Sequence, residues 1–271
     1  MKDIEQYRQF LERKKQTIQD SGFRVEEKDL NPILFPFQKY CVAKALKKGR
    51  YALFEDCGLG KTIQQLEWSR HIAAHTNKPV LIIAPLAVVG QTIAEGEKFG
   101  YEVIELDERP IRGGLYITNY DNIKNVVAKD YAGVVLDESS ILKNFDGETK
   151  KIIIELFSDT PYKLACTATP SPNDVMELCN HAEFLNVMSR NEMLAMYFIH
   201  DGGNTTSWRL KGHCEQMFWD FVSDWAVMLC KPSDIGFSDE GYVLPAMNLI
   251  ETHIETDKRD NGKLFNDTSV N

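Results

Sequence analysis

A glycine-rich turn between an apolar segment and a helical pattern carries the strongest chemical signal in the sequence. Tyr51–Phe54 is apolar, and the run Gly58-Leu59-Gly60-Lys61-Thr62-Ile63 follows it closely. An apolar strand, a glycine turn, a lysine and a hydroxyl residue, and then a helix form the order of a phosphate-binding loop. Glycines let backbone N–H groups turn toward a phosphate, and the first turn of a helix adds donors and a positive dipole end. The sequence therefore predicts a nucleotide-binding loop.

The residue types within the loop suggest separate roles. We expect Gly58, Leu59, Gly60 and Ile63 to line the nucleotide, because they form the turn and the start of the helix. Lys61 would neutralise the β- and γ-phosphates, and the Thr62 hydroxyl would hold Mg²⁺. The usual loop begins with a further glycine, and Glu55 stands at that position here. A chance glycine turn between a strand and a helix is the alternative reading.

Two adjacent carboxylates follow a second apolar segment. Gly133–Leu136 runs directly into Asp137 and Glu138. Open α/β sheets bind ligands at the carboxyl ends of their strands. Asp137 would bind the Mg²⁺ shell, and Glu138 would orient or deprotonate the attacking water. Such a pair alone is typical of a solvated loop, but downstream of a phosphate loop it predicts a site of nucleotide hydrolysis.

Other nucleotide-binding classes fit the sequence less well. A GTPase would carry Asn-Lys-x-Asp to read guanine, whereas Asn77-Lys78 is followed by Pro79-Val80. A small-molecule kinase usually has an arginine-rich lid, and no such cluster is present. The glutamate next to the Mg²⁺ aspartate favours hydrolysis that drives motion.

Alternating short apolar runs and helical patterns must position these residues. The predicted strands are residues 51–54, 80–84, 101–106, 114–118, 133–136 and 163–166, and the predicted helices between them are 62–75, 91–98, 121–127 and 147–157. Nearly uninterrupted Val, Ile and Leu are typical of strands covered on both faces of a parallel sheet. The pattern predicts an α/β fold of the RecA-like P-loop NTPase type, with helices on both faces of a mainly parallel sheet.

The remaining segments are expected to flank this core. We predict a helix over 2–20, a second helix from Phe37 to Lys48, and a helical appendage rich in Met, Phe and Trp with no strands up to about Lys231. Leu249–Ile254 is predicted to be one more strand. The expected organisation is 1–29 for the N-terminal helix and linker, 30–172 for the ATP-binding core, 173–235 for the appendage, 236–255 for the return to the core, and 256–271 for a polar tail.

Composition narrows the function classes. The 271 residues are 43% hydrophobic and carry a formal charge of −9. This charge disfavours a protein that coats nucleic acid, because such binding depends on Lys and Arg replacing counterions. The six cysteines have no CxxC pair, so we expect reduced, mostly buried thiols. Neither a signal peptide nor a membrane span is expected, which predicts a soluble, cytoplasmic protein without membrane partners.

The spacing of the histidines gives little support for a metal site. His71 and His75 lie one helical turn apart, a spacing that could hold a metal, but a third ligand is lacking nearby. We therefore expect them on a helix surface. His181, His200, His213 and His253 are isolated in the sequence.

In their order, these motifs resemble the first RecA-like lobe of a superfamily-two helicase, most closely the Swi/Snf-type DNA translocases, including compact phage and prophage versions. The resemblance covers about residues 30–250. Leu34–Gln38 resembles the Q motif, which implies that Gln38 reads the adenine edge. Asp56–Thr62 resembles the family's Asp-Glu-Met-Gly-Leu-Gly-Lys-Thr loop, in which the missing first glycine is not unusual.

The same resemblance implies contacts to DNA. Pro85 lies in a segment similar to motif Ia, and Thr118-Asn119-Tyr120 is similar to motif Ib, although a strand end with capping polar residues would look the same. Thr167-Ala168-Thr169-Pro170-Ser171-Pro172-Asn173 resembles motif III. In the family this motif passes the nucleotide state to the DNA groove, which implicates Thr167, Thr169 and Asn173. Ser140 replaces the histidine of the family's Asp-Glu-x-His block.

The resemblance also implies what the chain needs. The family works with two RecA-like lobes, and the second supplies arginines to the γ-phosphate. After Leu244-Pro245 the only arginine is Arg259. We therefore expect binding of ATP and Mg²⁺, weak hydrolysis, weak backbone contacts to DNA, and dependence on a second lobe in cis or in trans. The alternative is a non-motor ATP-binding switch that gates a protein contact through 173–235.

Overall fold

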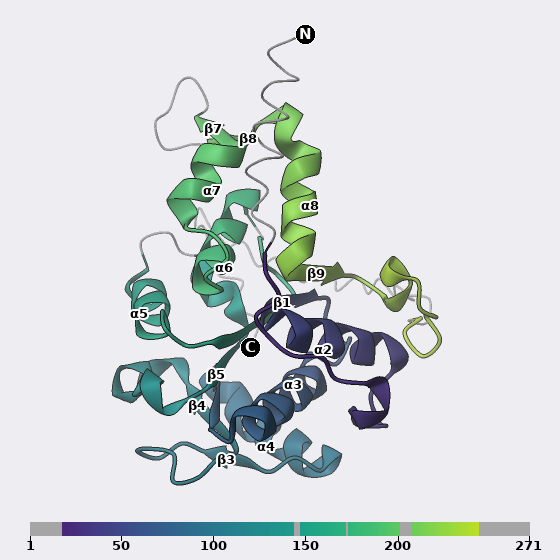
Figure 1. Cartoon of the computed structure of the whole chain (residues 1–271), viewed down its shortest axis with the longest axis vertical. Coiled ribbons are helices and arrows are strands. Elements are labelled where there is room, and N and C mark those ends of the chain that lie inside the picture. The colour runs from purple at the N-terminus through teal and green to yellow at the C-terminus, as the bar shows by residue number, and fades with distance from the viewer. Residues whose placement is uncertain (1–17, 144–146, 172, 201–207, 244–271) are drawn as a thin grey trace, which may run out of the picture.

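A seven-stranded parallel sheet forms the centre of the protein (Figure 1). The computed structural model describes residues 18–143, 147–171, 173–200 and 208–243. The strands are β1 (Arg50–Glu55), β2 (Val80–Ala84), β3 (Val103–Glu105), β4 (Leu115–Asn119), β5 (Gly133–Asp137), β6 (Tyr162–Thr167) and β9 (Ala226–Leu229). They lie in the order β3-β4-β2-β5-β6-β1-β9, and every pairing is parallel. The predicted α/β fold is confirmed.

Helices cover both faces of this sheet. One face packs on α2 (Pro36–Lys48), α3 (Lys61–Thr76) and α4 (Leu86–Phe99), and the other on α5 (Glu148–Leu156), α6 (Leu178–Phe184) and α8 (Glu215–Trp225). Successive residues of a strand point to opposite faces. The side chains of Tyr51 and Leu53 accordingly belong to the core on the face covered by α2, α3 and α4. Those of Ala52 and Phe54 belong to the core on the opposite face. Burial on both faces explains why the strands are almost uniformly apolar.

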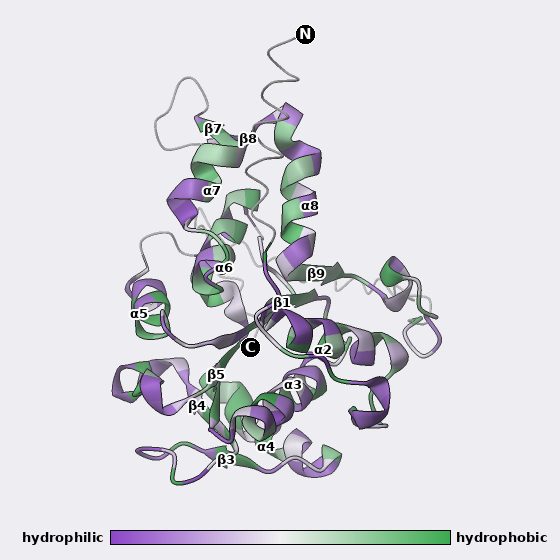
Figure 2. Cartoon of the chain, in the orientation of Figure 1, coloured by the Kyte–Doolittle hydropathy of each residue, from purple (hydrophilic) through white to green (hydrophobic). Residues whose placement is uncertain are grey.

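A smaller group of elements stands beyond the sheet, at the top of Figure 1. Helix α7 (Arg190–Tyr197) leads into a two-stranded antiparallel hairpin, β7 (Phe198–His200) and β8 (Trp208–Leu210), and α8 lies beside it. In Figure 2, α7 and α8 carry hydrophobic and hydrophilic stretches side by side, as expected of helices with one buried face. Short 3-10 helices complete the described chain: η1 (Glu27–Asp29), η2 (Tyr120–Asn125), η3 (Ala128–Asp130), η4 (Ser139–Lys143), η5 (Val175–Glu177), η6 (Gly212–Cys214) and η7 (Pro232–Ile235).

Several predicted boundaries are corrected. The strand expected over 101–106 is limited to Val103–Glu105, because the N–H of Tyr101 bonds to the carbonyl of Gly96 at the end of α4. The helix expected over 121–127 is the 3-10 helix η2, and α4 begins before 91, directly after Pro85. Residues 18–20 are not helical, and the rest of the helix predicted over 2–20 lies outside the described residues.

The appendage predicted to be free of strands contains three of them. Besides β7 and β8, it includes β9, which joins the main sheet beside β1. Ala226–Leu229 follows α8 without glycine or proline, so its four residues extend an apolar helical pattern and cannot be separated from it by periodicity. The strand predicted at 249–254 and the tail lie outside the described residues, and the division into domains stays a prediction. Within the described chain, no helix combines the length and apolar character needed to cross a bilayer.

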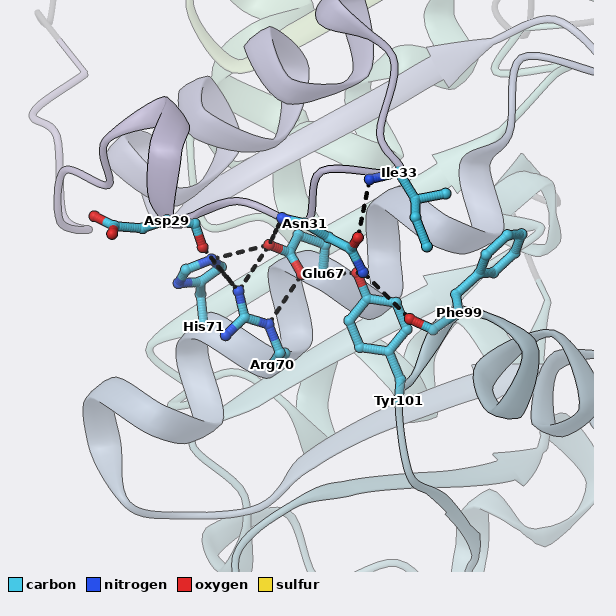
Figure 3. A network of polar contacts seen from close by, with 8 residues as sticks. All are labelled: Asp29, Asn31, Ile33, Glu67, Arg70, His71, Phe99 and Tyr101. Atoms are coloured by element: carbon cyan, nitrogen blue, oxygen red, sulfur yellow. Dashed lines mark hydrogen bonds and ion pairs between the residues drawn. The ribbon is translucent and has the colours of Figure 1, made fainter.

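A buried carboxylate on α3 holds the segment that precedes α2 against α3 (Figure 3). The Glu67 side chain is fully buried on α3. Its oxygens accept hydrogen bonds from the Asn31 backbone N–H (2.9 Å), from the Arg70 guanidinium (2.8 and 3.0 Å) and from the Tyr101 hydroxyl (2.8 Å). The His71 ring lies 3.1 Å away. Asn31 precedes α2, so this network fixes both helices that reach the predicted nucleotide site.

The network also sets the ionisation of this carboxyl. Burial alone would raise the pKa of Glu67, but hydrogen bonds from His71, Arg70 and Tyr101 hold it well below its usual range. A carboxyl with a depressed folded pKa stabilises the protein above its unfolded pKa, which is about 4.3. That contribution begins to fall as the pH drops below this value, and it is lost as the pH falls through the depressed folded pKa.

We predict that Glu67→Gln lowers the free energy of unfolding by about 2 kcal/mol at neutral pH, because it removes the charge that four neighbouring groups contact. The difference from the unsubstituted chain should shrink at pH about 3. Urea unfolding followed by circular dichroism measures both values. Glu97→Gln, on an exposed position of α4, is the matched control and should change neither. An equal loss at both pH values would contradict the assigned role of the charge.

Candidate nucleotide site

The predicted phosphate loop and the predicted acids lie at the same edge of the sheet. The loop follows β1, Thr167 ends β6 and Asp137 ends β5, and β6 lies between the other two strands. Because all three strands are parallel, their carboxyl ends meet at one edge. Neighbouring strands are about 4.8 Å apart, so β1 and β5 lie roughly 10 Å apart. The positive charge of Lys61 acts on the carboxyl of Asp137 across this gap.

The two loop glycines adopt backbone conformations that other residues avoid. Gly58 has φ 86° and Gly60 has φ 77°. A Cβ at Gly60 would also lie 2.4 Å from Nε2 of Gln38, whereas a Cβ at Gly58 would meet nothing within 4 Å. Gly60 is therefore required by both conformation and space, while the loop backbone at Gly58 borders open space.

The lysine of the loop is held by neutral acceptors. Nζ of Lys61 donates to the backbone carbonyls of Glu55 (2.8 Å) and Asp56 (3.1 Å). Carbonyls do not cancel its charge, so the ammonium remains able to attract an anion. Thr62 is half-buried beside it on the first turn of α3. Leu59 and Ile63 are buried, so their side chains anchor the loop.

Glu55 is a buried carboxyl beneath the loop. Its Oε2 accepts a 2.6 Å hydrogen bond from the Gln64 amide, and its Oε1 has no partner among the described residues. Burial raises the pKa of Glu55 to about 7, against the opposing effects of Gln64 and Lys61. The sequence marked Glu55 only as a departure from the usual loop. In the sequence, the polar residue Gln64, one helical turn after the loop, is the signal that could have revealed the partner of Glu55.

Gln38 fastens helix α2 to the phosphate loop. Its side-chain oxygen accepts from the N–H of Phe35 (3.0 Å), and its amide donates to the carbonyl of Leu59 (2.8 Å). The side chain is buried, so both ends of the amide are satisfied within the protein. A contact between Gln38 and adenine stays a prediction that requires one of these bonds to be shared or exchanged.

The second acid is held in an unusual conformation. Glu138 has φ 58°, in the left-handed region that residues with side chains rarely adopt. Its Oε1 accepts a 2.6 Å hydrogen bond from the hydroxyl of Thr167, and that hydroxyl accepts from the N–H of Thr169. The structure thus brings Thr167 of the predicted motif III against the predicted water-activating acid, and Thr169 supports Thr167.

The first acid is partly shielded from water. Burial raises the pKa of the Asp137 carboxyl. The amide of Gln65, on α3, lies close enough to oppose this shift, although the two side chains make no regular hydrogen bond. The hydroxyl of Tyr120 donates to the Asp137 carbonyl at 2.7 Å and so fastens the end of β5.

The residues predicted to contact DNA divide into two groups. Thr118 and Asn119 are buried, and Asn119 accepts from two backbone N–H groups at the start of η2. These features, with the Tyr120 bond, match the alternative of a strand end with capping polar residues. Pro85 lies at the same edge, at the N-cap of α4, and Asn173 is exposed and bonds to Glu177. A DNA-contact role stays a prediction for all of them, and Pro172 lies outside the described residues.

The histidine pair on α3 is structural. His71 contacts Glu67, and His75 stacks on Phe23 with ring centres 3.9 Å apart. Among the described residues, no group of three His, Cys, Asp or Glu side chains could hold a metal ion. None of the six cysteines, all within the described residues, forms a disulfide, and four of them are buried.

Comparison with known proteins shows what the chain as a whole is similar to. No family model matches the chain. Helicase SWR1 of Yarrowia lipolytica is 30% identical over 162 residues, which are 52% of this chain and 9% of SWR1. The SWI/SNF-related matrix-associated actin-dependent regulator of chromatin subfamily A-like protein 1 homolog of Caenorhabditis elegans is 26% identical over 174 residues, 56% of this chain and 25% of that protein. The chain spans a quarter or less of these two relatives.

A solved structure shares the fold. The SWI2/SNF2 ATPase core of Sulfolobus solfataricus, in complex with dsDNA, aligns with a TM-score of 0.64 and 22% identity. The alignment covers 80% of this chain and 48% of that core. The chain is thus similar in sequence to SNF2-family helicases and shares the fold of a SWI2/SNF2 ATPase core, which together support a first RecA-like lobe of the Swi/Snf type.

Proposed function

We propose that this chain binds ATP with Mg²⁺ and hydrolyses it as the motor lobe of a DNA helicase or translocase. A second RecA-like lobe, in cis or in trans, would be needed for full activity. The main support is the placement of the Lys61 loop and of Asp137 and Glu138 at one edge of the sheet, in a relative of Swi/Snf-type proteins.

The described residues fit a magnesium nucleotide. The open space at Gly58 leaves room for phosphate beside the loop backbone. Thr62 and Asp137 would hold Mg²⁺, with phosphate oxygens and water completing its shell, because Mg²⁺ usually takes only one or two carboxylates from a protein. When bound, the ion would neutralise charge on the phosphates. Lys61 would add a second positive charge, and Glu138 would orient or deprotonate the attacking water.

Coupling to DNA belongs to the same proposal. The structural neighbour was solved with dsDNA, and its fold covers most of this chain. The formal charge of −9 argues that any DNA contact of this lobe is local. We therefore expect weak binding with a steep salt dependence. A second lobe would add the arginines that stabilise charge on the γ-phosphate.

We predict that Lys61→Ala weakens ATP binding at least about 100-fold, since it removes the counter-charge of the phosphates, a loss of about 2.7 kcal/mol. Isothermal titration calorimetry with ATP and Mg²⁺ measures the affinity. Lys78→Ala, at an exposed lysine after α3, is the control and should bind ATP like the unsubstituted chain. Unchanged affinity in the Lys61 variant would refute the phosphate loop.

We predict that Glu138→Gln retains ATP affinity and lowers hydrolysis by about 100-fold or more, because a general base contributes at least that factor. The rate is measured by release of labelled phosphate, with affinity determined in parallel. Glu155→Gln, at an exposed position of α5, is the matched control. Hydrolysis at the original rate would assign water activation to another group.

The non-motor switch is the second candidate. It is favoured by the contact of α6, within 173–235, with the turn that follows Glu138.

We predict that duplex DNA stimulates hydrolysis only when a second lobe is joined to the chain or added to it. Turnover with and without duplex DNA, for the chain alone and with that lobe, tests this. Absence of stimulation in both forms would favour the switch.

A further inference from the structure

Helix α6 contacts the acid-bearing turn at both ends. The ring Nε2 of His181 lies 3.2 Å from the hydroxyl oxygen of Ser139, the first residue of η4. The amide of Asn180 donates to the carbonyl of Leu142 at 2.8 Å, near the end of η4. We call Asn180 and His181 the α6 clamp. Because η4 follows Glu138 directly, the clamp holds the chain that leaves the predicted water-activating acid.

The neighbours of His181 define its hydrogen-bonding state. Its Nδ1 lies 3.4 Å from the backbone carbonyl of Glu177, which can only accept. With the proton on Nδ1, the ring donates to this carbonyl and Nε2 accepts from the Ser139 hydroxyl. The ring is fully buried and packs edge-on against Phe54 of β1, with centres 5.0 Å apart. Burial lowers the pKa of His181 to about 4, so the ring is neutral under ordinary conditions.

The conformation of Glu138 explains why a clamp is needed. A left-handed φ of 58° is unfavourable for a residue with a side chain, and it persists only when the surroundings enforce it. Thr167 holds the carboxylate of Glu138. The backbone that follows is held through Ser139, whose side chain is fully buried against α6.

We propose that His181 and Asn180 are positioning residues for Glu138, acting through the Ser139 hydroxyl and the Leu142 carbonyl; this inference rests on the proposed water-activating role of Glu138. Without the His181–Ser139 bond, η4 can shift and Glu138 can leave its left-handed conformation. The carboxylate then points away from the attacking water, while the phosphate loop on β1 and α3 is unaffected. The clamp should therefore act on the hydrolytic step and leave ATP affinity unchanged.

Two single variants and their combination test the bond. Ser139→Ala removes the hydroxyl with a minimal change of volume, and His181→Leu removes the acceptor while keeping an apolar side chain. We expect each to lower the single-turnover rate of ATP hydrolysis about tenfold, with ATP affinity within about twofold. The double variant should be no slower than the slower single variant, because both remove the same bond.

Ser69→Ala is the matched control. Its hydroxyl on α3 is as buried as that of Ser139 but has no partner among the described residues. It should hydrolyse ATP at the unsubstituted rate. A Ser139→Ala rate within about twofold of the unsubstituted chain would overturn the inference, even if His181→Leu fails to fold. A double variant whose loss of hydrolysis rate is the product of the two single losses would also overturn the inference. A chain that binds no ATP would instead overturn the proposed function.

Nitrogen-15 NMR of the histidine side chains gives a readout independent of nucleotide. The resonances of His181 are identified by their absence from the spectrum of His181→Leu. At neutral pH they should show a protonated Nδ1 and an unprotonated Nε2. Ser139→Ala should shift the Nε2 resonance, because its hydrogen bond is gone. A proton on Nε2, or a resonance unmoved by Ser139→Ala, would overturn the assigned bond.

Discussion

Polar groups at the carboxyl edge of the sheet lose water when helices cover both faces, and a buried polar group without a hydrogen-bond partner is costly. The partners they find belong to other elements. Gln38 of α2 bonds to the phosphate loop, Thr167 at the end of β6 bonds to Glu138, and His181 of α6 bonds to Ser139. These bonds tie α2 to the phosphate loop, β6 to Glu138, and α6 to the segment that follows Glu138.

The layout of the site could largely be predicted from the sequence. A glycine turn after one apolar strand and paired acids after another imply a shared edge as soon as the sheet is parallel. The strands were recognisable because burial on both faces makes them uniformly apolar. β9 was missed because it continues directly from α8, and its pairing with β1 is a long-range contact that no local pattern encodes.

Side-chain partners could not be predicted in the same way. Asn119 has the composition of a polar contact residue, yet it caps the start of η2. His181 is isolated in the sequence and becomes informative only when α6 brings it to Ser139, 42 residues away. Glu55 looked like a defect of the loop and is a buried carboxyl with a partner on α3. In each case the partner is set by tertiary packing and lies several residues or several elements away.

The hydrogen bonds that hold the ammonium of Lys61 lower the entropic cost of binding an anion. A free lysine side chain loses about 2 kcal/mol of rotamer freedom when it is immobilised. In this loop two of its three N–H groups already bond to the carbonyls of Glu55 and Asp56, which leaves the third for an arriving anion. Much of that ordering is completed during folding, so the triphosphate proposed to bind here would meet a preorganised cation and would be spared most of the cost of fixing it.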